Sequence, residues 1–389
     1  MRLIHTSDWH LGRSFHRVGL LGAQAAYLDH LVDVVRSEHV DAVLVSGDVY
    51  DRALPGPDTV ELLSDGVLRL IDAGAQVVLS SGNHDSARRL GFASDLLERA
   101  GLHIRTRVDA IGTPVLVGDV AVHPLPYLEP LATAAVLDAV EPTHAAVLRA
   151  AMARVRADLA GRAGPSVVMA HAVVTGGATS ASERDIGVGG VSAVHPDTFS
   201  GAAYVALGHL HGPQRIADHL RYSGSPIALS FGEADHTKVS LLVDLDESGA
   251  HVQPVEAPVP KRLARLRGTL DELLSDPAHR AAESAWCQVT LTDETRPRGA
   301  MERLQRRFPG TLSLVFDGPT PLDRARTYAS RTRQRDDLEL CCDFLEHVRG
   351  GAVADEAEQA LLARAVEDSR RARSRRDDEG TARRARGVA

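Results

Sequence analysis

The chain has 389 residues, 44% of them hydrophobic and 25% charged, and this length and balance indicate a globular protein with two or more domains. The formal net charge of −8 excludes a global basic surface for a nucleic-acid backbone, and an aromatic content of 4% disfavours a stacking platform for single strands. The N-terminus lacks the apolar core of a signal peptide and no apolar run is long enough to cross a membrane, so we expect a cytoplasmic protein.

Residues 1–257 alternate short apolar segments with segments of helical periodicity. Continuous apolar strands separated by helices are typical of a largely parallel sheet that helices cover on both faces. The predicted strands are Leu3–Thr6, Asp41–Ser46, Gln76–Ser80, Val120–Leu125, Ser166–Ala170, Tyr204–Leu207 and Val239–Asp244. The predicted helices are Gly22–Glu38, Asp58–Asp72, Ser86–Ala100 and an alanine-rich region that ends near Ala160.

Two prolines in Ala257–Lys261 (APVPK) end this first domain, in which the glycine- and serine-rich segment Thr175–Gly190 is predicted to be an exposed loop. Residues 258–332 are expected to form a small α+β domain, residues 333–368 C-terminal helices, and residues 369–389 a charged, arginine-rich, disordered tail. The elements predicted for the small domain are Leu263–Arg267, Thr269–Ser275, Trp286–Thr292, Ala300–Phe308 and Thr311–Phe316, in the order β-α-β-α-β.

Five short motifs of polar residues follow directly after predicted strands. In an open α/β sheet, ligands bind beyond the carboxyl ends of the strands, so motifs far apart in the chain are expected to meet on one rim. The motifs are Asp8-Trp9-His10, Gly47-Asp48-Val49-Tyr50-Asp51, Gly82-Asn83-His84-Asp85, His171 and Gly208-His209-Leu210-His211. Each motif alone is most often an ordinary turn, and Trp9 alone most often a packing residue, but five in order indicate one shared site.

The residue types in these motifs indicate divalent metal ions. Residues two apart in extended backbone face the same way, so Asp8 and His10 can chelate one ion, and His209 and His211 can do the same from the opposite side. Two carboxylates, an amide oxygen and four imidazoles, without a thiolate, suit two first-row ions such as manganese or iron, about 3.5–4 Å apart. Asp48, central on its strand end, is the natural bridge, and the motif glycines allow the backbone to approach closely.

The series DxH, GDxxD, GNHD, a single His and GHxH resembles that of the calcineurin-like metallophosphoesterases. Arg221–Glu233 (RYSGSPIALSFGE) and Arg184-Asp185-Ile186 are similar to one branch of this family, the SbcD nuclease subunits of bacterial SbcCD complexes. The resemblance covers nearly the whole chain. It implies an α/β fold of the four-layer metallophosphoesterase type, with mixed sheets flanked by helices, a small α+β capping domain and C-terminal helices.

Residue roles carried over by position come from this resemblance. The implied metal ligands are Asp8, His10, Asp48 and His211 for one ion, and Asp48, Asn83, His171 and His209 for the other. His84 is implied to face the scissile phosphate and to protonate or stabilise the leaving oxygen, with Asp51 as a second catalytic residue that accepts a hydrogen bond from His84. Asp51 argues against the purple acid phosphatases, whose tyrosine ligand falls at this position. Arg13, Arg88 and Arg89 are candidates for phosphate contacts, with solvated helix faces as an equal alternative.

The branch resemblance implies an Mn²⁺-dependent 3′-5′ double-strand DNA exonuclease and single-strand or hairpin endonuclease of DNA repair and recombination. It also implies a homodimer through Gly22–Glu38 and Asp58–Asp72, and a heterotetramer with two copies of an SbcC-type ATPase, whose coiled coil meets the 333–368 helices. The alternative for these helices is packing back on the chain's own domains. Two other functions stay open: a free-standing phosphodiesterase for small nucleotides, which should lack the capping domain and the docking helices, and a non-catalytic scaffold, which should lack metal ligands.

Overall fold

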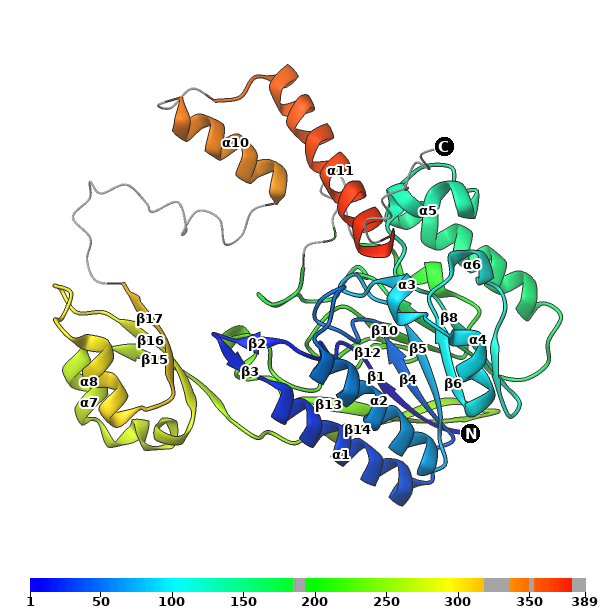
Figure 1. Cartoon of the computed structure of the whole chain (residues 1–389), viewed down its shortest axis with the longest axis horizontal. Coiled ribbons are helices and arrows are strands. Elements are labelled where there is room, and N and C mark those ends of the chain that lie inside the picture. The colour runs from blue at the N-terminus through cyan, green and yellow to red at the C-terminus, as the bar shows by residue number, and fades with distance from the viewer. Residues whose placement is uncertain (185, 187–192, 318–335, 350–352, 380–389) are drawn as a thin grey trace, which may run out of the picture.

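The structure is a computed structural model that describes residues 1–184, 186, 193–317, 336–349 and 353–379. Two six-stranded sheets stack on each other within residues 1–256 (Figure 1). The first sheet has the order β14 (Gly249–Glu256), β13 (Val239–Asp246), β1 (Arg2–Thr6), β4 (Ala42–Ser46), β5 (Gln76–Ser80) and β6 (Leu102–Arg105). The second has the order β11 (Gln214–Ala217), β12 (Leu220–Tyr222), β10 (Tyr204–Gly208), β9 (Ser166–His171), β8 (Val120–Pro124) and β7 (Val115–Val117).

Both sheets are parallel at their centres and antiparallel at their edges. The strands β1, β4, β5 and β6 pair in parallel in the first sheet, and β8, β9, β10 and β12 do so in the second. The antiparallel partners β13 with β14, β7 and β11 complete the edges. The seven predicted strands are confirmed. The strands β6, β7, β11 and β12 were not predicted because they have only three or four residues each, and β14 because it lacks a continuous apolar run.

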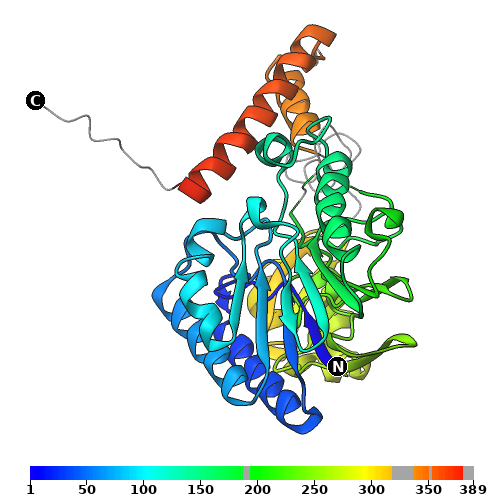
Figure 2. The ribbon, with the colours of Figure 1, turned by 90° about the vertical axis from the view of Figure 1, so that its right-hand side faces the viewer.

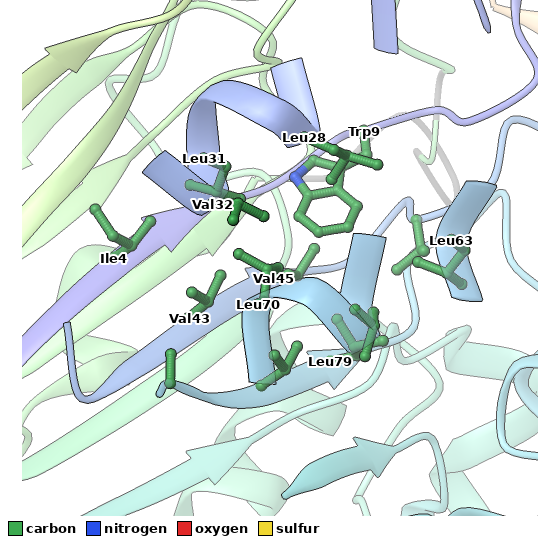
Figure 3. Packing of buried hydrophobic residues seen from close by; sticks show 14 of the residues in the cluster. Ile4, Trp9, Leu28, Leu31, Val32, Val43, Val45, Leu63, Leu70 and Leu79 are labelled. Atoms are coloured by element: carbon green, nitrogen blue, oxygen red, sulfur yellow. The ribbon is translucent and has the colours of Figure 1, made fainter. Parts of the chain in front are cut away.

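Helices cover the outer face of each sheet, which gives four layers. The helices α1 (Leu21–Glu38) and α2 (Pro57–Asp72) pack on the first sheet, and α5 (Pro130–Leu137) and α6 (His144–Leu159) pack on the second. Side chains alternate along the strands, so that one set meets the helices and the other fills the space between the sheets. Trp9 lies among Leu28, Leu63 and other apolar side chains of the outer core, as predicted (Figure 3).

The prediction of one helix over Ser86–Ala100 is wrong. The segment contains two single-turn helices, α3 (Ala87–Leu90) and α4 (Ser94–Leu97), and the 3-10 helix η1 (Glu98–Ala100). Gly91 ends α3 and lies against Thr106, where a Cβ would come within 2.4 Å of the threonine hydroxyl, and Ala93 has a left-handed backbone with φ 57°. The low helical propensity of Gly91 and the left-handed backbone of Ala93 coincide with the interruption of the predicted helix.

The described residues beyond 258 form a small α+β domain with its own three-stranded sheet, followed by two helices. The strands β15 (Leu263–Gly268), β16 (Trp286–Leu291) and β17 (Thr311–Phe316) form a parallel sheet with α7 (Leu270–Ser275) and α8 (Ala300–Arg307), in the predicted element order. This small sheet, yellow in Figure 1, lies beside the β2–β3 hairpin (Ser14–Phe15, Val18–Gly19). Phe15 stacks on Trp286 across that contact, with ring centroids 5.6 Å apart.

The C-terminal helices are α10 (Asp337–Val348) and α11 (Glu356–Glu379). The prediction of a disordered tail from residue 369 is wrong up to Glu379, because the arginine-rich segment continues α11, and residues 380–389 lie outside the described residues. The helix α11 contacts α3 and α5, so it packs on the first domain (Figure 2). Among the described residues, none of the helices combines the length and the apolar character that a bilayer span requires.

Candidate metal centre

The five motifs meet at one rim of the stacked sheets. The first sheet contributes Asp8 and His10 after β1, Asp48 after β4, and Asn83 and His84 after β5. The second sheet contributes His171 at the end of β9, and His209 and His211 after β10. The aspartate and histidine side chains expected as ligands are all at most 3% exposed, whereas Asn83 and His84 are half-buried.

The backbone is strained where it presents these side chains. Asp8, His10, Asp48 and His209 all have left-handed backbones, with φ between 43° and 102°. Non-glycine residues in this region cost free energy and persist where the surrounding structure requires them, which is frequent at functional sites. Gly208 shows how close the loops come, because a Cβ there would lie 1.9 Å from the carbonyl oxygen of Ser46.

The ligands predicted for the first ion converge. The Nε2 atoms of His10 and His211 are 3.2 Å apart, and Asp8 lies with both in a group whose ligand atoms are all within 4.8 Å of one another. Asp8 also accepts a hydrogen bond from Ser7 and one from the backbone N–H of His209, which fixes its carboxylate.

The ligands predicted for the second ion converge equally. The Oδ1 atom of Asn83 lies 2.9 Å from Nε2 of His171 and 3.1 Å from Nδ1 of His209. His171 faces the carbonyl of Ser46 with its Nδ1 atom at 3.0 Å, and a carbonyl accepts only, so the proton is on Nδ1. Nε2 is then the ring atom directed into the site, where a bound metal ion would take the place of a proton.

Asp48 lies between these two groups. Its Oδ2 atom is 3.5 Å from Nε2 of His10 on one side and 3.4 Å from Nε2 of His171 on the other. Its Oδ1 atom accepts a hydrogen bond of 2.8 Å from the backbone N–H of His84, which orients the carboxylate. One oxygen is therefore available to both groups of ligands.

The charges and protonation states of these side chains favour the binding of cations at this centre. Burial lowers the pKa of His10 to about 3 and that of His209 well below its usual value, so both rings are neutral. Burial opposes ionisation of Asp48, but the neighbouring His171 and His84 outweigh it and hold its pKa well below the usual range. Burial likewise opposes a charge on His171, but Asp48 and Asp8 raise its pKa to about 9. Oxygen and neutral nitrogen donors around two carboxylates fit hard or borderline divalent ions.

Several residues that the sequence motifs did not identify hold this geometry. Gln24 of α1 is 2% exposed and donates to the backbone oxygens of His10 and Trp9. Asp85 accepts hydrogen bonds from the backbone N–H groups of Val49, Tyr50 and Gly82, which ties the second motif to the third. Asp85 belongs to the GNHD motif but had no role in the site assigned to it, and Gln24 carried no signal in the sequence.

The sequence predicts a hydrogen bond from His84 to the Asp51 carboxylate, and the structure differs. The Nδ1 atom of His84 donates to the main-chain oxygen of Asp51 at 2.9 Å. The Asp51 carboxylate turns the other way, 3.1 Å from Nη1 of Arg13 and 3.4 Å from Nδ1 of His10. Asp51 therefore acts on His84 through its backbone and on His10 through its side chain.

The three arginines proposed for phosphate contacts differ in position. Arg13 is tied to Asp51 and to the backbone oxygen of Ser182, so it is a part of the site's own framework. Arg89 donates to the backbone oxygen of Ala53. Arg88 is exposed and lines a cavity of about 810 Å³ that opens beside Asn83 and extends to Arg370 and Arg373 of α11. Of the three arginines, Arg88 is the one that lines this cavity.

Comparisons with known proteins agree with this geometry. Residues 1–213 match the family model described as calcineurin-like phosphoesterase. The chain belongs to the calcineurin-like phosphoesterase family. Residues 259–349 of this phosphoesterase match a second model, SbcD_C, described as Type 5 capsule protein repressor C-terminal domain. The two matches in one chain confirm the resemblance to the SbcD branch.

Two solved structures to which this phosphoesterase is similar are distant from it in sequence. The protein TT1561 of Thermus thermophilus matches 65% of this chain and 98% of its own length, with 12% identity and a TM-score of 0.38. A β-glucosidase from Exiguobacterium marinum matches 81% of this chain and 88% of its own, with 9% identity and a TM-score of 0.22. Neither likeness is close enough to add to the argument. The family and the buried cluster of aspartates and histidines support a phosphoester hydrolase that binds divalent metal.

Proposed function

We propose that this phosphoesterase is an Mn²⁺-dependent DNA nuclease, with 3′-5′ exonuclease activity on duplexes and endonuclease activity on single strands and hairpins. The observation that carries the proposal is the position of Asp48 Oδ2, within 3.5 Å of a histidine nitrogen in each of the two ligand groups. A shared carboxylate is what a two-metal site for phosphodiester cleavage needs. The match of residues 259–349 to the SbcD_C model favours DNA over small nucleotides as substrate.

The proposed ligand sets are Asp8, His10, Asp48 and His211 for one ion, and Asp48, Asn83, His171 and His209 for the other. When bound, the two cations supply charge stabilisation to the phosphodiester oxygens and lower the pKa of water toward about 7. The backbone N–H of His84 donates to Oδ1 of Asp48 and fixes the carboxylate, so that Oδ2 stays between the two ligand groups. His84 has Nδ1 tied to the Asp51 carbonyl, so Nε2 is the nitrogen that can meet a substrate and give a proton to the leaving oxygen.

The proposal includes a partner ATPase of the SbcC type, in a heterotetramer with two copies of each chain. The exposed apolar residues Val348 on α10 and Leu361 on α11 support a coiled-coil partner for these helices. The proposed homodimer uses α1 and α2, and exposed Val60 and Leu68 on α2 support an apolar contact there. A net charge of −8 fits a nuclease that obtains much of its DNA affinity from its partner.

A single assay separates the proposed function from its alternatives. Purified full-length protein is incubated with Mn²⁺ and a linear duplex labelled at one 5′ end, with and without the ATPase, and with bis-p-nitrophenyl phosphate in parallel. We expect a ladder of progressively shorter labelled strands, which is the product pattern of 3′-5′ degradation. Release of the label as a mononucleotide would contradict the polarity. Hydrolysis of bis-p-nitrophenyl phosphate without any action on DNA would favour a small-nucleotide phosphodiesterase, and inertness toward both would favour a scaffold.

A further inference from the structure

The segment Ser180–Arg184 reaches into the metal centre, although the sequence predicts an exposed loop there. Ser182 Oγ lies 2.6 Å from Nδ1 of His211, and Glu183 accepts a hydrogen bond of 2.8 Å from the backbone N–H of the same histidine. Arg184 donates to the backbone oxygen of Asn83 at 3.1 Å. Ser182 and Glu183 therefore contact the loop that carries His211, a proposed ligand of one ion. Arg184 contacts the loop that carries Asn83, a proposed ligand of the other.

The hydroxyl of Ser182 connects His211 to a buried carboxylate. Ser182 has one hydroxyl proton and donates it to Oε1 of Glu233. The hydroxyl oxygen is then an acceptor for His211, so that Nδ1 of His211 carries the ring proton. In the neutral ring, Nε2 is left with its lone pair, and this atom points at Nε2 of His10, inside the first ligand group.

Glu233 is held by a second buried charge. Its side chain is fully buried and pairs with Lys238, whose side chain is 4% exposed. Lys238 also donates to the backbone oxygen of His211 at 2.9 Å, so the pair secures both the ring and the main chain of this residue. A buried ion pair adds little to stability compared with apolar side chains of similar volume. Its place directly behind a metal ligand agrees better with a role in orienting that ligand.

We propose that Ser182 and Glu233 are positioning residues of the metal centre. The relay from His211 Nδ1 through the Ser182 hydroxyl to the Glu233 carboxylate fixes the metal-binding tautomer of His211 and the direction of its ring. This inference rests on the proposed two-metal function. Outer hydrogen-bond partners of metal-bound histidines typically change metal affinity by about 10–100-fold when they are removed.

Two serines that donate to the same carboxylate oxygen provide a matched pair of variants. Ser182 and Ser230 both donate to Glu233 Oε1, Ser230 at 3.1 Å, but only Ser182 also contacts His211. Metal-free full-length protein is titrated with MnCl₂ in a calorimeter, and its thermal unfolding without metal is recorded in parallel. We expect Ser182→Ala to weaken Mn²⁺ binding about 10–100-fold, and Ser230→Ala and Ser182→Thr, which keeps the hydroxyl, to bind like the wild type.

A second set of variants tests whether Ser182 and Glu233 act together. Glu233→Gln combined with Lys238→Met removes both charges of the buried pair, and we expect weaker Mn²⁺ binding. Adding Ser182→Ala to this background should change affinity less than it does in the wild type, because both act through one relay. Equal titrations of Ser182→Ala and Ser230→Ala, or additive effects in the second set, would overturn the inference. Absence of DNA cleavage by a wild type that binds two Mn²⁺ ions would instead contradict the proposed function.

Discussion

The ring of His5 on β1 accepts a hydrogen bond from the hydroxyl of Tyr204 on β10, with Nδ1 and the hydroxyl oxygen 2.9 Å apart. The other ring nitrogen, Nε2, lies 3.1 Å from the carbonyl oxygen of Leu207 and must carry the proton, because a carbonyl only accepts. His5 is fully buried between the two large sheets. A neutral imidazole is therefore a part of the contact between them.

This contact predicts a loss of stability in acid. Burial lowers the pKa of His5 from 6.5 to about 3, so the unfolded chain takes up the proton first and stability falls as the pH falls from about 6.5 toward 3. Between pH 6.5 and pH 4, the free energy of unfolding of the wild type should fall by about 3 kcal/mol more than that of His5→Gln, which keeps hydrogen-bonding groups but does not titrate. Urea unfolding followed by circular dichroism measures both, and parallel pH profiles would refute the assignment.

Replacing Asp48 should remove metal and activity together. In Asp48→Asn the oxygen between His10 and His171 loses its negative charge, so both proposed ions lose the anionic ligand that they share. We expect the Mn²⁺ content of the dialysed protein, measured by elemental analysis, to fall from two ions per chain to one or none. Asp72→Asn, an exposed acid at the end of α2, is the control and should retain two ions. A variant at position 48 with full metal content would contradict the bridging role.

Removal of His84 should separate chemistry from metal binding. His84 is half-buried and has its Nδ1 atom occupied by the Asp51 carbonyl, so its remaining nitrogen is the group that can serve the leaving oxygen. His84→Ala should lower the rate of phosphodiester cleavage about 10²–10⁴-fold at saturating Mn²⁺, with two ions still bound. The rate is measured under single-turnover conditions. A proportional loss of metal would show that His84 supports the site and not the chemistry.

Asp51 should behave differently from His84. Its carboxylate faces Arg13 and the Nδ1 atom of His10, and the carbonyl that holds His84 is unaffected by a change of side chain. Asp51→Ala should therefore raise the Mn²⁺ concentration needed for half-maximal activity about 10–100-fold, while the rate at saturating Mn²⁺ falls less than in His84→Ala. Activity measured over a Mn²⁺ series for both variants tests this, and identical profiles would restore the catalytic role implied by the family resemblance.

The sequence predicted the central strands and the rim at which the motifs meet, because apolar runs such as that of Ala42–Ser46 are local signals that need no knowledge of distant partners. It failed where the decisive contact is with a distant residue. Ser182 and Glu233 meet His211 only in the folded chain. The direction of the Asp51 carboxylate was missed for the same reason, since sequence separation does not show which atoms of a residue face a neighbour.

The proposed ligands of each ion come from both sheets of the sandwich, with Asp8, His10 and Asp48 on one side and His209 and His211 on the other. Ions bound there would connect the two sheets at the rim that carries the ligands. The hydrogen bond between His5 and Tyr204 connects the same sheets in the interior. Bound metal would then stabilise the packing of the two sheets by mass action, because separation of the sheets would release the ions. With manganese as the proposed ion, a cell short of it would hold this protein in a form that is inactive and more easily cleaved by proteases.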